Sequence, residues 1–407
     1  MTTAQQPVSA QTRKLTNQYI SHTYSRFELE IVRGQGSIAF GADGREYIDM
    51  GSGIATNTFG FCDPLWQQAV TEQLSTVAHT SNLYYTAPSA RLAQLLCERT
   101  SMARVFFGNS GAEANEAAIK VARKYSAERY GMGDGVKAPF NLPERYTILT
   151  LNHSFHGRTL STLAATGQDQ YHELFQPLTP GFVNVPAEDL GAVAAAHEET
   201  PLAGVLIELV QGEGGVIKLS KQYVQALATW CAENDVPFMV DEVQTGNGRT
   251  GTLYAFQQYG ITPDVVSTAK GLGGGLPIGA ILIGEKLKDV LSPGDHGSTF
   301  GANPICCAGA INVIERLDEN LLTQVRTKSE YLRAAFEDVS GVSAVTGMGL
   351  LLGLQTEHEP MRVAKKCQDN GVLVLTAKNK VRLAPALNIP MELLERAVAV
   401  ITASCAQ

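Results

Sequence analysis

Short apolar runs alternate with amphipathic segments through the middle of the chain. Runs rich in β-branched and aromatic residues lie at 105–107, 148–151, 238–240 and 265–266. Such runs, bounded by glycine or polar residues, are typical of buried strands. Between two of them, the segment Lys221–Asn234 repeats apolar residues with a helical period. This succession of strand, helix and strand predicts an α/β fold with a parallel, doubly wound sheet.

The two ends of the chain show a different pattern. Residues 32–53 carry glycine turns between short alternating runs, which predicts a small antiparallel sheet with a hairpin turn at Asp43-Gly44. Beyond Asn303-Pro304, a long apolar helix is expected at Ile305–Leu317 and a charged helix at Thr323–Val339. The segments VTGMGLLLGLQ, GVLVLTA and KVRLAPAL are then typical of strands, and a closing helix follows at Met391–Ala403.

These patterns predict three parts of the chain. Residues 61–310 should form a large domain around the parallel sheet. Residues 311–407 should form a smaller α/β domain that the N-terminal segment, residues 1–60, joins. We expect this smaller domain to close over the site of the larger one.

Composition excludes several classes of protein. The 407 residues are 44% hydrophobic and 18% charged, and the net charge is −8, so no basic field attracts nucleic acid or an anionic membrane. The segment Met1–Lys14 is polar, and no run of 18 apolar residues occurs. The sequence therefore predicts neither a signal peptide nor a membrane span, and we expect a cytoplasmic protein.

The seven cysteines are an odd number, and no two form a C-x-x-C pair. In a chain of this size they indicate reduced thiols and not disulfides or zinc ligands. We therefore expect no metal site.

Lys270 is the first candidate for chemistry. It follows the strand that contains Val265 and Val266, and glycine-rich residues come directly after it, in the order KGLGGGLP. A lysine at such a strand end can lose solvation, lower its pKa and form a Schiff base with a carbonyl cofactor. The alternative is a solvated lysine before a glycine turn.

A second candidate is the turn between the strand at 105–107 and the helix from Ala112. The residues Gly108-Asn109-Ser110-Gly111 make this turn. A helix N-terminus offers unpaired N–H groups and a positive dipole end, which suit a phosphate. An ordinary strand-to-helix connection capped by Ser110 is the alternative. A Walker loop is excluded because no Gly-Lys-Ser/Thr follows.

Acidic and polar side chains gather at predicted strand ends. Because ligands bind at the carboxyl ends of parallel strands, this edge is the expected site. The residues placed there are Glu208, Glu213, Asp241, Gln244 and Lys270.

Asp241 is the decisive member of this group, because it follows the buried run Phe238–Val240. A desolvated carboxylate there needs a cation or a donor, and a protonated ring nitrogen would satisfy it. Phe155 and Arg158, after the strand at 148–151, could stack on a flat ring and bind a carboxylate, although a core phenylalanine and a surface arginine are the alternative. Pyridoxal phosphate supplies the matching aldehyde, phosphate, ring and ring nitrogen.

In order along the chain, the motifs NSGAEANEAAIKVAR, FHGRTL, QGEGG, DEVQTGNGRTG, AKGLGGGLPIGA and HGSTFGANP resemble those of the subgroup III, ornithine-type aminotransferases of fold type I. The likeness extends from about Gly34 to the C-terminus. It implies a large domain with a mostly parallel seven-stranded sheet, a smaller α/β domain, and pyridoxal 5'-phosphate as the cofactor.

The resemblance also implies roles for single residues. Lys270 would be the Schiff-base lysine and the general base, and Asp241 would pair with the pyridine nitrogen. Gln244 would lie near the ring hydroxyl, and Phe155 would stack on the ring. The phosphate would be held by Ser110, Gly111 and Ala112. Thr299 would reach the phosphate, and Ser298 the substrate, of a neighbouring subunit, so the resemblance implies a homodimer with shared active sites.

The implied substrates differ in where they carry a carboxylate. Arg158 would bind the carboxylate end remote from the reacting amine, and Arg382 would bind the carboxylate beside the reacting carbon of glutamate. For a substrate with no carboxylate there, Glu213 would neutralise Arg382 instead, and this pair is a specificity switch.

Within the subgroup, the motifs are most similar to those of enzymes that act on N2-acetyl-L-ornithine. The implied reaction moves its terminal amino group to 2-oxoglutarate and gives N-acetylglutamate 5-semialdehyde and glutamate, a step of arginine biosynthesis. Ile54 stands where, by the resemblance, ornithine-specific enzymes carry a tyrosine, which favours the acylated substrate, but enzymes that act on 4-aminobutyrate also have an aliphatic residue there. Succinylornithine, free ornithine and 4-aminobutyrate remain alternatives. A non-catalytic pyridoxal-phosphate-binding protein or a glycine-rich nucleotide binder is the alternative from a different class.

Two features depart from the family pattern. The chain has Phe300-Gly301-Ala302 where Tyr-Gly-Gly is usual, and the turn-rich segment 131–144 looks like an insertion. Either could alter the entrance to the site.

Overall fold

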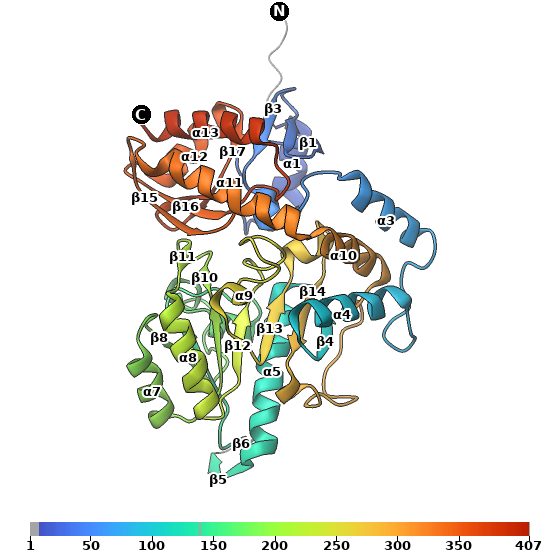
Figure 1. Ribbon diagram of the computed structural model, residues 1–407, viewed down its shortest axis with the longest axis vertical. Helices are drawn as coiled ribbons and strands as arrows, with labels where there is room; N and C mark the ends of the chain where they lie inside the picture. Colours follow the sequence, from blue (N-terminus) through green and yellow to red (C-terminus); the bar gives the residue numbers. More distant parts are fainter. Residues whose placement is uncertain (1–7, 138–139, 407) are drawn as a thin grey trace, which may run out of the picture.

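The fold is built on a central sheet, seen in a computed structural model that describes residues 8–137 and 140–406. Strand β14 is antiparallel to both of its neighbours, and the other neighbouring strands run parallel. The predicted α/β fold with a mostly parallel seven-stranded sheet is confirmed. Across the sheet the strands are β4 (Arg104–Gly108), β14 (Gly279–Ile283), β13 (Val265–Thr268), β12 (Phe238–Asp241), β9 (Leu202–Glu208), β7 (Thr147–Leu151) and β8 (Phe182–Val185) (Figure 1).

Helices cover both faces of this sheet because its strands are apolar on both sides. In β12, Met239 packs into an apolar cluster with helix α5 (Gly111–Tyr130), while the next residue, Val240, packs into the cluster that contains helix α8 (Lys221–Glu233). Successive side chains of a strand point to opposite faces, so both faces are buried. Only the ends of the strands are left to form a site.

A second sheet and its helices form the upper part of the molecule (Figure 1). Its strands, in order, are β15 (Val342–Met348), β16 (Leu351–Thr356), β19 (Lys380–Leu383) and β18 (Leu375–Ala377). The helices beside it are α11 (Glu319–Glu337), α12 (Pro360–Asp369) and α13 (Met391–Cys405).

A third sheet joins the two ends of the chain. Strands β1 (Ile31–Gln35), β2 (Ile38–Gly41) and β3 (Glu46–Asp49) are antiparallel, as the glycine-turn pattern predicts. Strand β17 (Val372–Leu373) then pairs with β3 in parallel. The N-terminal segment is therefore bonded to the C-terminal part, although the boundaries 1–60, 61–310 and 311–407 stay predictions.

The remaining elements are short strands and helices around these sheets. The helices are α1 (Ala10–Tyr19), α2 (Ser52–Ala55), α3 (Pro64–Leu74), α4 (Ala87–Thr100), α6 (Leu160–Ala165), α7 (Leu190–Glu199), α9 (Phe256–Tyr259), α10 (Pro304–Arg316) and the 3-10 turns η1 (Asp169–Tyr171), η2 (Lys270–Gly273) and η3 (Glu285–Leu287). The strands are β5 (Met132–Lys137), β6 (Phe140–Pro143), β10 (Val210–Gln211) and β11 (Ile217–Lys218).

Two local details differ from the sequence pattern. The segment VTGMGLLLGLQ is a hairpin of β15 and β16 that turns at Gly349, where φ is 58°. Helix α11 begins at Glu319, earlier than the predicted Thr323, because the Asp318 side chain accepts a hydrogen bond from the Leu321 N–H and caps the helix.

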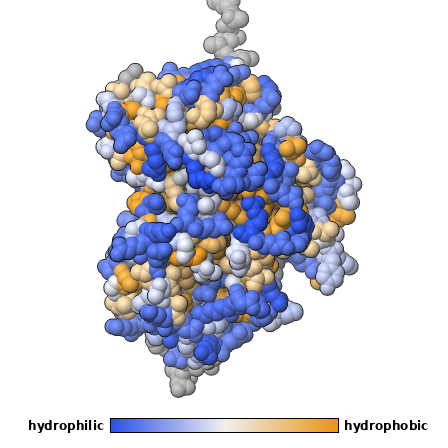
Figure 2. Space-filling model, in the orientation of Figure 1, coloured by the Kyte–Doolittle hydropathy of each residue, from blue (hydrophilic) through white to orange (hydrophobic). Residues whose placement is uncertain are grey.

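Some expectations concern stretches of chain that the structure leaves undescribed. Residues 1–7 of the predicted polar lead-in and residues 138–139 of the turn-rich segment lie outside the described residues. Within the described residues, no helix is long and apolar enough to cross a membrane, and no group of three or more His, Cys, Asp or Glu side chains is arranged to hold a metal ion. All seven cysteines are free thiols. Hydrophilic residues cover most of the face in Figure 2, with apolar residues gathered near its middle.

Asp63 links helix α3 to helix α10 through hydrogen bonds with both. Its Oδ1 accepts a hydrogen bond from the Trp66 N–H, which caps α3. Arg316 of α10 donates to both oxygens, at 2.5 and 3.0 Å, and its guanidinium lies over the Phe59 ring. Burial raises the pKa of Asp63, but its hydrogen bonds with Arg316 and the Trp66 N–H outweigh burial and hold the pKa below its usual value.

We expect Asp63→Asn to lower the free energy of unfolding by about 1–2 kcal/mol at pH 7, because Asn still caps α3 but cannot pair with Arg316 as a carboxylate does. Since the pKa of Asp63 is lowered in the folded protein, the effect should be full above the unfolded pKa of about 4 and disappear as the pH falls through the folded value. Urea denaturation measures both.

Asp289→Asn is the control, because the Arg104–Asp289 pair is exposed and should contribute little. Equal losses in the two variants, or none in Asp63→Asn, would contradict the role of the Asp63–Arg316 pair.

Candidate active site

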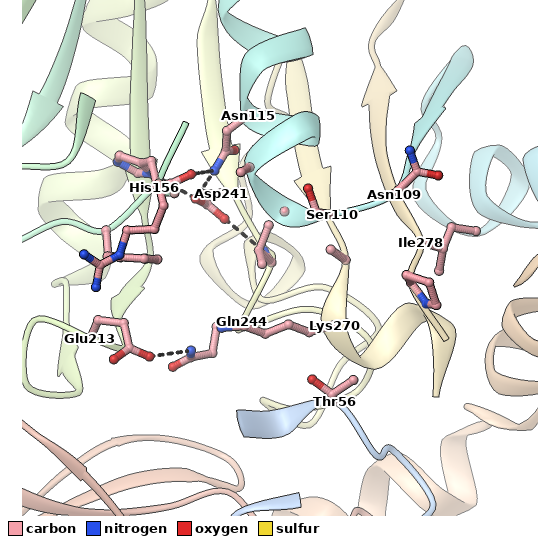
Figure 3. Close-up of a pocket in the computed structure, with 18 of the residues that line it drawn as sticks. Thr56, Asn109, Ser110, Asn115, His156, Glu213, Asp241, Gln244, Lys270 and Ile278 are labelled. Carbon is pink, nitrogen blue, oxygen red and sulfur yellow. Dashed lines mark hydrogen bonds and ion pairs between the residues drawn. The ribbon is translucent and has the colours of Figure 1, made fainter. Parts of the chain in front are cut away.

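A cavity of about 470 Å³ lies at the carboxyl ends of the parallel strands, where the sequence predicts the site. The turns after β4, β7, β9, β12 and β13 all contribute to its lining (Figure 3). Ten of the predicted site residues line it: Ser110, Gly111, Ala112, Phe155, Arg158, Glu208, Glu213, Asp241, Gln244 and Lys270.

Lys270 lies in a strained turn directly after β13. Its φ is 43°, a backbone conformation that residues other than glycine rarely adopt. Neighbouring groups must therefore stabilise this turn. Asn247 Nδ2 donates to the carbonyl of Ala269 at 3.1 Å, and Thr58 Oγ1 donates to the carbonyl of Gly271 at 2.7 Å. Burial lowers the pKa of the Lys270 amine, which increases its neutral, nucleophilic fraction.

Asp241 is the last residue of β12 and is 4% exposed. Its Oδ2 accepts hydrogen bonds from Asn115 Nδ2 at 2.7 Å and from His156 Nδ1 at 2.8 Å. Its Oδ1 accepts one from the Val243 N–H at 3.0 Å. These contacts fix the carboxylate at the edge of the same cavity that Lys270 lines (Figure 3).

The N-terminus of α5 faces the cavity. Ser110 caps the helix by accepting from the Glu113 N–H, and the first bond within the helix runs from Ala114 N to Ser110 O. The N–H groups of Gly111 and Ala112 precede that bond and so have no partner within the helix. Together with the helix dipole, they suit an anion such as a phosphate.

Glu213 connects the cavity to the second sheet. Its Oε1 accepts from Nη1 of Arg382 at 2.5 Å, and Arg382 lies on β19 and is 4% exposed. Burial raises the pKa of Glu213, but the charges of Arg382 and Lys270 outweigh it and hold the pKa below its usual value. Gln244 bonds both members of the pair, at 3.3 and 3.4 Å.

Arg158 lies among aromatic rings at the cavity. Its guanidinium is 4.0 Å from the ring centroid of Tyr171 and 5.4 Å from that of Phe155. The two rings themselves meet edge to face. Cation–π contacts of this kind hold a guanidinium in place while leaving its N–H groups able to bind a carboxylate.

Ser298 and Thr299 do not line this cavity. They line a separate one with exposed residues such as Leu83. Asn109 Nδ2 donates to Ser298 Oγ at 3.0 Å, so the two regions are adjacent through the turn before α5.

Asn115, His156 and Tyr171 contribute contacts that the sequence reasoning missed. A signal for two of them exists: His156 follows Phe155 in the FHGR motif, and Asn115 lies one helical turn after Gly111 on the same face. Tyr171 has no such signal, because it lies in a separate 3-10 turn.

Residues 19–404 match the class-III aminotransferase family. The chain belongs to this family. It is 48% identical to the acetylornithine aminotransferase of Haemophilus ducreyi over 97% of this chain and 98% of that protein. It is also 40% identical to the acetylornithine aminotransferase of Caldanaerobacter subterraneus subsp. tengcongensis, over 94% of this chain and 96% of that protein.

Solved structures have the same fold over nearly the whole chain. The ornithine aminotransferase of Toxoplasma gondii superposes with a TM-score of 0.91 and 28% identity, over 98% of this chain and 95% of that one. The acetylornithine aminotransferase of Elizabethkingia anophelis superposes with a TM-score of 0.84 and 29% identity, over 97% of this chain and 98% of that one. The predicted family and fold are confirmed.

We expect Asn115→Ala to lower the free energy of unfolding by about 1–3 kcal/mol, because it removes a donor from a buried carboxylate. Asn115→Asp should destabilise the protein more at pH 7, since it brings a second carboxylate to Asp241. That excess should shrink in acid, because one of the two acids takes up a proton more readily in the folded protein. Urea denaturation of the protein without added cofactor measures both.

The exposed helical Asn17→Ala is the control and should change the unfolding free energy by less than about 0.5 kcal/mol. An Asn115→Ala variant as stable as wild type would show that Asp241 does not depend on this amide.

Proposed function

We propose that this protein transfers the terminal amino group of N-acetylornithine to 2-oxoglutarate, with pyridoxal 5'-phosphate as its cofactor. The observation that carries the proposal is that one cavity is lined by a lysine amine with a lowered pKa, a fixed buried carboxylate and a free helix N-terminus. The names of the similar proteins, acetylornithine aminotransferases, support the choice of substrate.

The residues present fit this cofactor. The Lys270 amine matches an aldehyde, and the buried Asp241 carboxylate matches a protonated ring nitrogen, which gives it the cation it needs. The N–H groups of Gly111 and Ala112, with the hydroxyl of Ser110, match a phosphate. Phe155 and Gln244, also on the cavity, would contact the ring and its hydroxyl.

Each residue then has a defined task in the reaction. When bound, pyridoxal phosphate supplies a ring that withdraws electrons from the substrate carbon. Asn115 and His156 keep the Asp241 carboxylate fixed at the cavity edge, where it would hold a proton on the ring nitrogen. The neutral Lys270 amine would take the proton from the amine-bearing carbon of the substrate as a general base, and its protonated form would deliver a proton, as a general acid, to the cofactor carbon that had carried the aldehyde.

Three charged residues fit the two substrates. Arg158, held by aromatic rings, would bind the carboxylate of N-acetylornithine that is remote from the reacting amine. Arg382 would bind the carboxylate beside the reacting carbon of glutamate once Glu213 moves away. With N-acetylornithine, Glu213 would stay on Arg382, in the pairing seen at 2.5 Å.

The homodimer and the cytoplasmic location are part of the proposal. Leu83, Tyr84 and Tyr85 are 87%, 72% and 107% exposed, and Leu83 lies on the cavity that Ser298 and Thr299 line. Exposed apolar residues of this size favour a partner surface. A second subunit covering them would bring Ser298 and Thr299 towards its own active site.

We expect Lys270→Ala to lower transamination by at least about 10²–10⁴-fold, because the general base is lost. It should also abolish covalent attachment of the cofactor on borohydride reduction, as measured by mass spectrometry of the peptide that carries residue 270. Lys328→Met is the control, since Lys328 is also buried with a lowered pKa but bonds the Leu387 carbonyl, away from the cavity. Attachment that persists in Lys270→Ala would contradict the assignment.

We expect Glu213→Gln to raise KM for N-acetylornithine at least about tenfold, because Arg382 then stays buried without a counter-charge. The half-reaction with glutamate should keep its rate. Single-turnover spectra with each substrate measure the two halves separately.

The double variant Glu213→Gln with Arg382→Gln tests the cause. Because no charge is left uncompensated, it should recover N-acetylornithine binding relative to Glu213→Gln, but it should become poor with glutamate, since Arg382 no longer binds the glutamate carboxylate. If Glu213→Gln impaired the half-reactions with N-acetylornithine and with glutamate equally, the specificity switch would be disproved.

A further inference from the structure

Glu208 is a buried acid that the proposed reaction does not use. It ends β9 in register with Asp241 of β12 and is 6% exposed. Burial raises its pKa well above the usual value, and the neighbouring Asp241 charge raises it further. A carboxyl group in such a place is costly unless its oxygens are satisfied.

Both oxygens of Glu208 bind backbone N–H groups of loops that line the cavity. Oε2 accepts from the Phe155 N–H at 2.9 Å, and Oε1 accepts from the Gly212 N–H at 3.3 Å. Phe155 lies three residues before Arg158, and Gly212 directly precedes Glu213. One side chain therefore joins the two loops that carry these charged residues.

The second loop passes close to the side chain of Gln244. A Cβ on Gly212 would lie 1.8 Å from Gln244 Oε1, so the loop backbone approaches Gln244 as closely as a glycine allows. A carboxyl group has an oxygen at both bonding positions whether or not it is protonated. An amide has an oxygen at only one and would face the other N–H with a donor.

We propose that Glu208 is a positioning residue that fixes the loop 152–158 relative to the loop 211–215, and thereby sets the distance between Arg158 and Glu213 at which the substrates fit. The proposal rests on the proposed function for the roles of Arg158 and Glu213, and it adds how their spacing is set. Glu208 acts through these loops and not on the reacting atoms.

Glu242 provides a matched control in the same chain. It is also a fully buried acid at the end of a central strand, and burial raises its pKa to about 7. Its oxygens accept from the Phe256 N–H and the Thr245 hydroxyl, and it does not line the cavity. Glu242→Gln therefore makes the same chemical change without touching either loop.

Hydrogen exchange tests the two bonds directly. In cofactor-loaded protein without substrate, we expect Glu208→Gln to speed exchange at the amide of Phe155, of Gly212, or of both by about tenfold, the factor for loss of one hydrogen bond to a buried acid. Glu242→Gln should leave these two amides at their wild-type rates. Wild-type exchange at both amides in Glu208→Gln would overturn the proposal.

Kinetics separate positioning from a merely structural role. We expect KM for N-acetylornithine and for 2-oxoglutarate to rise about tenfold in Glu208→Gln, with a smaller change in kcat, because ground-state and transition-state binding are weakened together. In Glu242→Gln both KM values should stay within about twofold of wild type. Faster exchange with both KM values unchanged would make Glu208 structural only and would overturn the proposal.

Glu208→Asp covers the case in which the amide variant does not fold. The shorter carboxylate is expected to reach one of the two N–H groups, so exchange and KM should change in the same direction. Wild-type values of both in this variant would also overturn the proposal. If wild-type protein failed to transaminate N-acetylornithine, the proposed function would fall, whereas the exchange measurement, made without substrate, would still test the two bonds of Glu208.

Discussion

The site depends on one buried carboxylate that three donors hold in place. Asp241 ends a strand with both faces covered and is only 4% exposed, so neighbouring groups must supply most of its hydrogen-bond donors. Asn115 comes from α5, His156 from the turn after β7, and the Val243 N–H from its own turn. A single charge thus connects three segments of the large part. The hydrogen bonds that this carboxylate needs position helix α5, the turn after β7 and the end of β12 relative to one another at the cavity.

Much of the architecture could be predicted because its signals are local. The run at 238–240 followed by Asp241, and the run before Lys270, are strands because β-branched and apolar residues continue to a polar end. Asp63 and Ser110 begin helices where the sequence has capping residues. The alternation of such elements was sufficient to place the carboxyl ends of the strands together, and with them most of the candidate site.

What could not be predicted depends on contacts between distant segments. The hydrogen bond of Asn115 to Asp241 spans 126 positions, and that of Glu208 to Phe155 spans 53. The periodic pattern of apolar residues does not indicate which distant residues will form a hydrogen bond. The positive φ of Lys270 could not be predicted either, because the side chains that bond the flanking carbonyls, Thr58 and Asn247, are distant in sequence or lie in another loop. The Glu213–Arg382 pair came from family resemblance and not from spacing, since Arg382 belongs to another sheet.

The pairing of β3 with β17 determines when the N-terminal sheet can be completed during synthesis. Strands β1 to β3 leave the ribosome more than three hundred residues before their fourth strand, Val372–Leu373. During synthesis the edge of β3 is open while the large sheet already has all of its strands. Because an unpaired strand edge can pair with the wrong strand, the nascent chain exposes a site for mispairing at β3 until β17 has emerged.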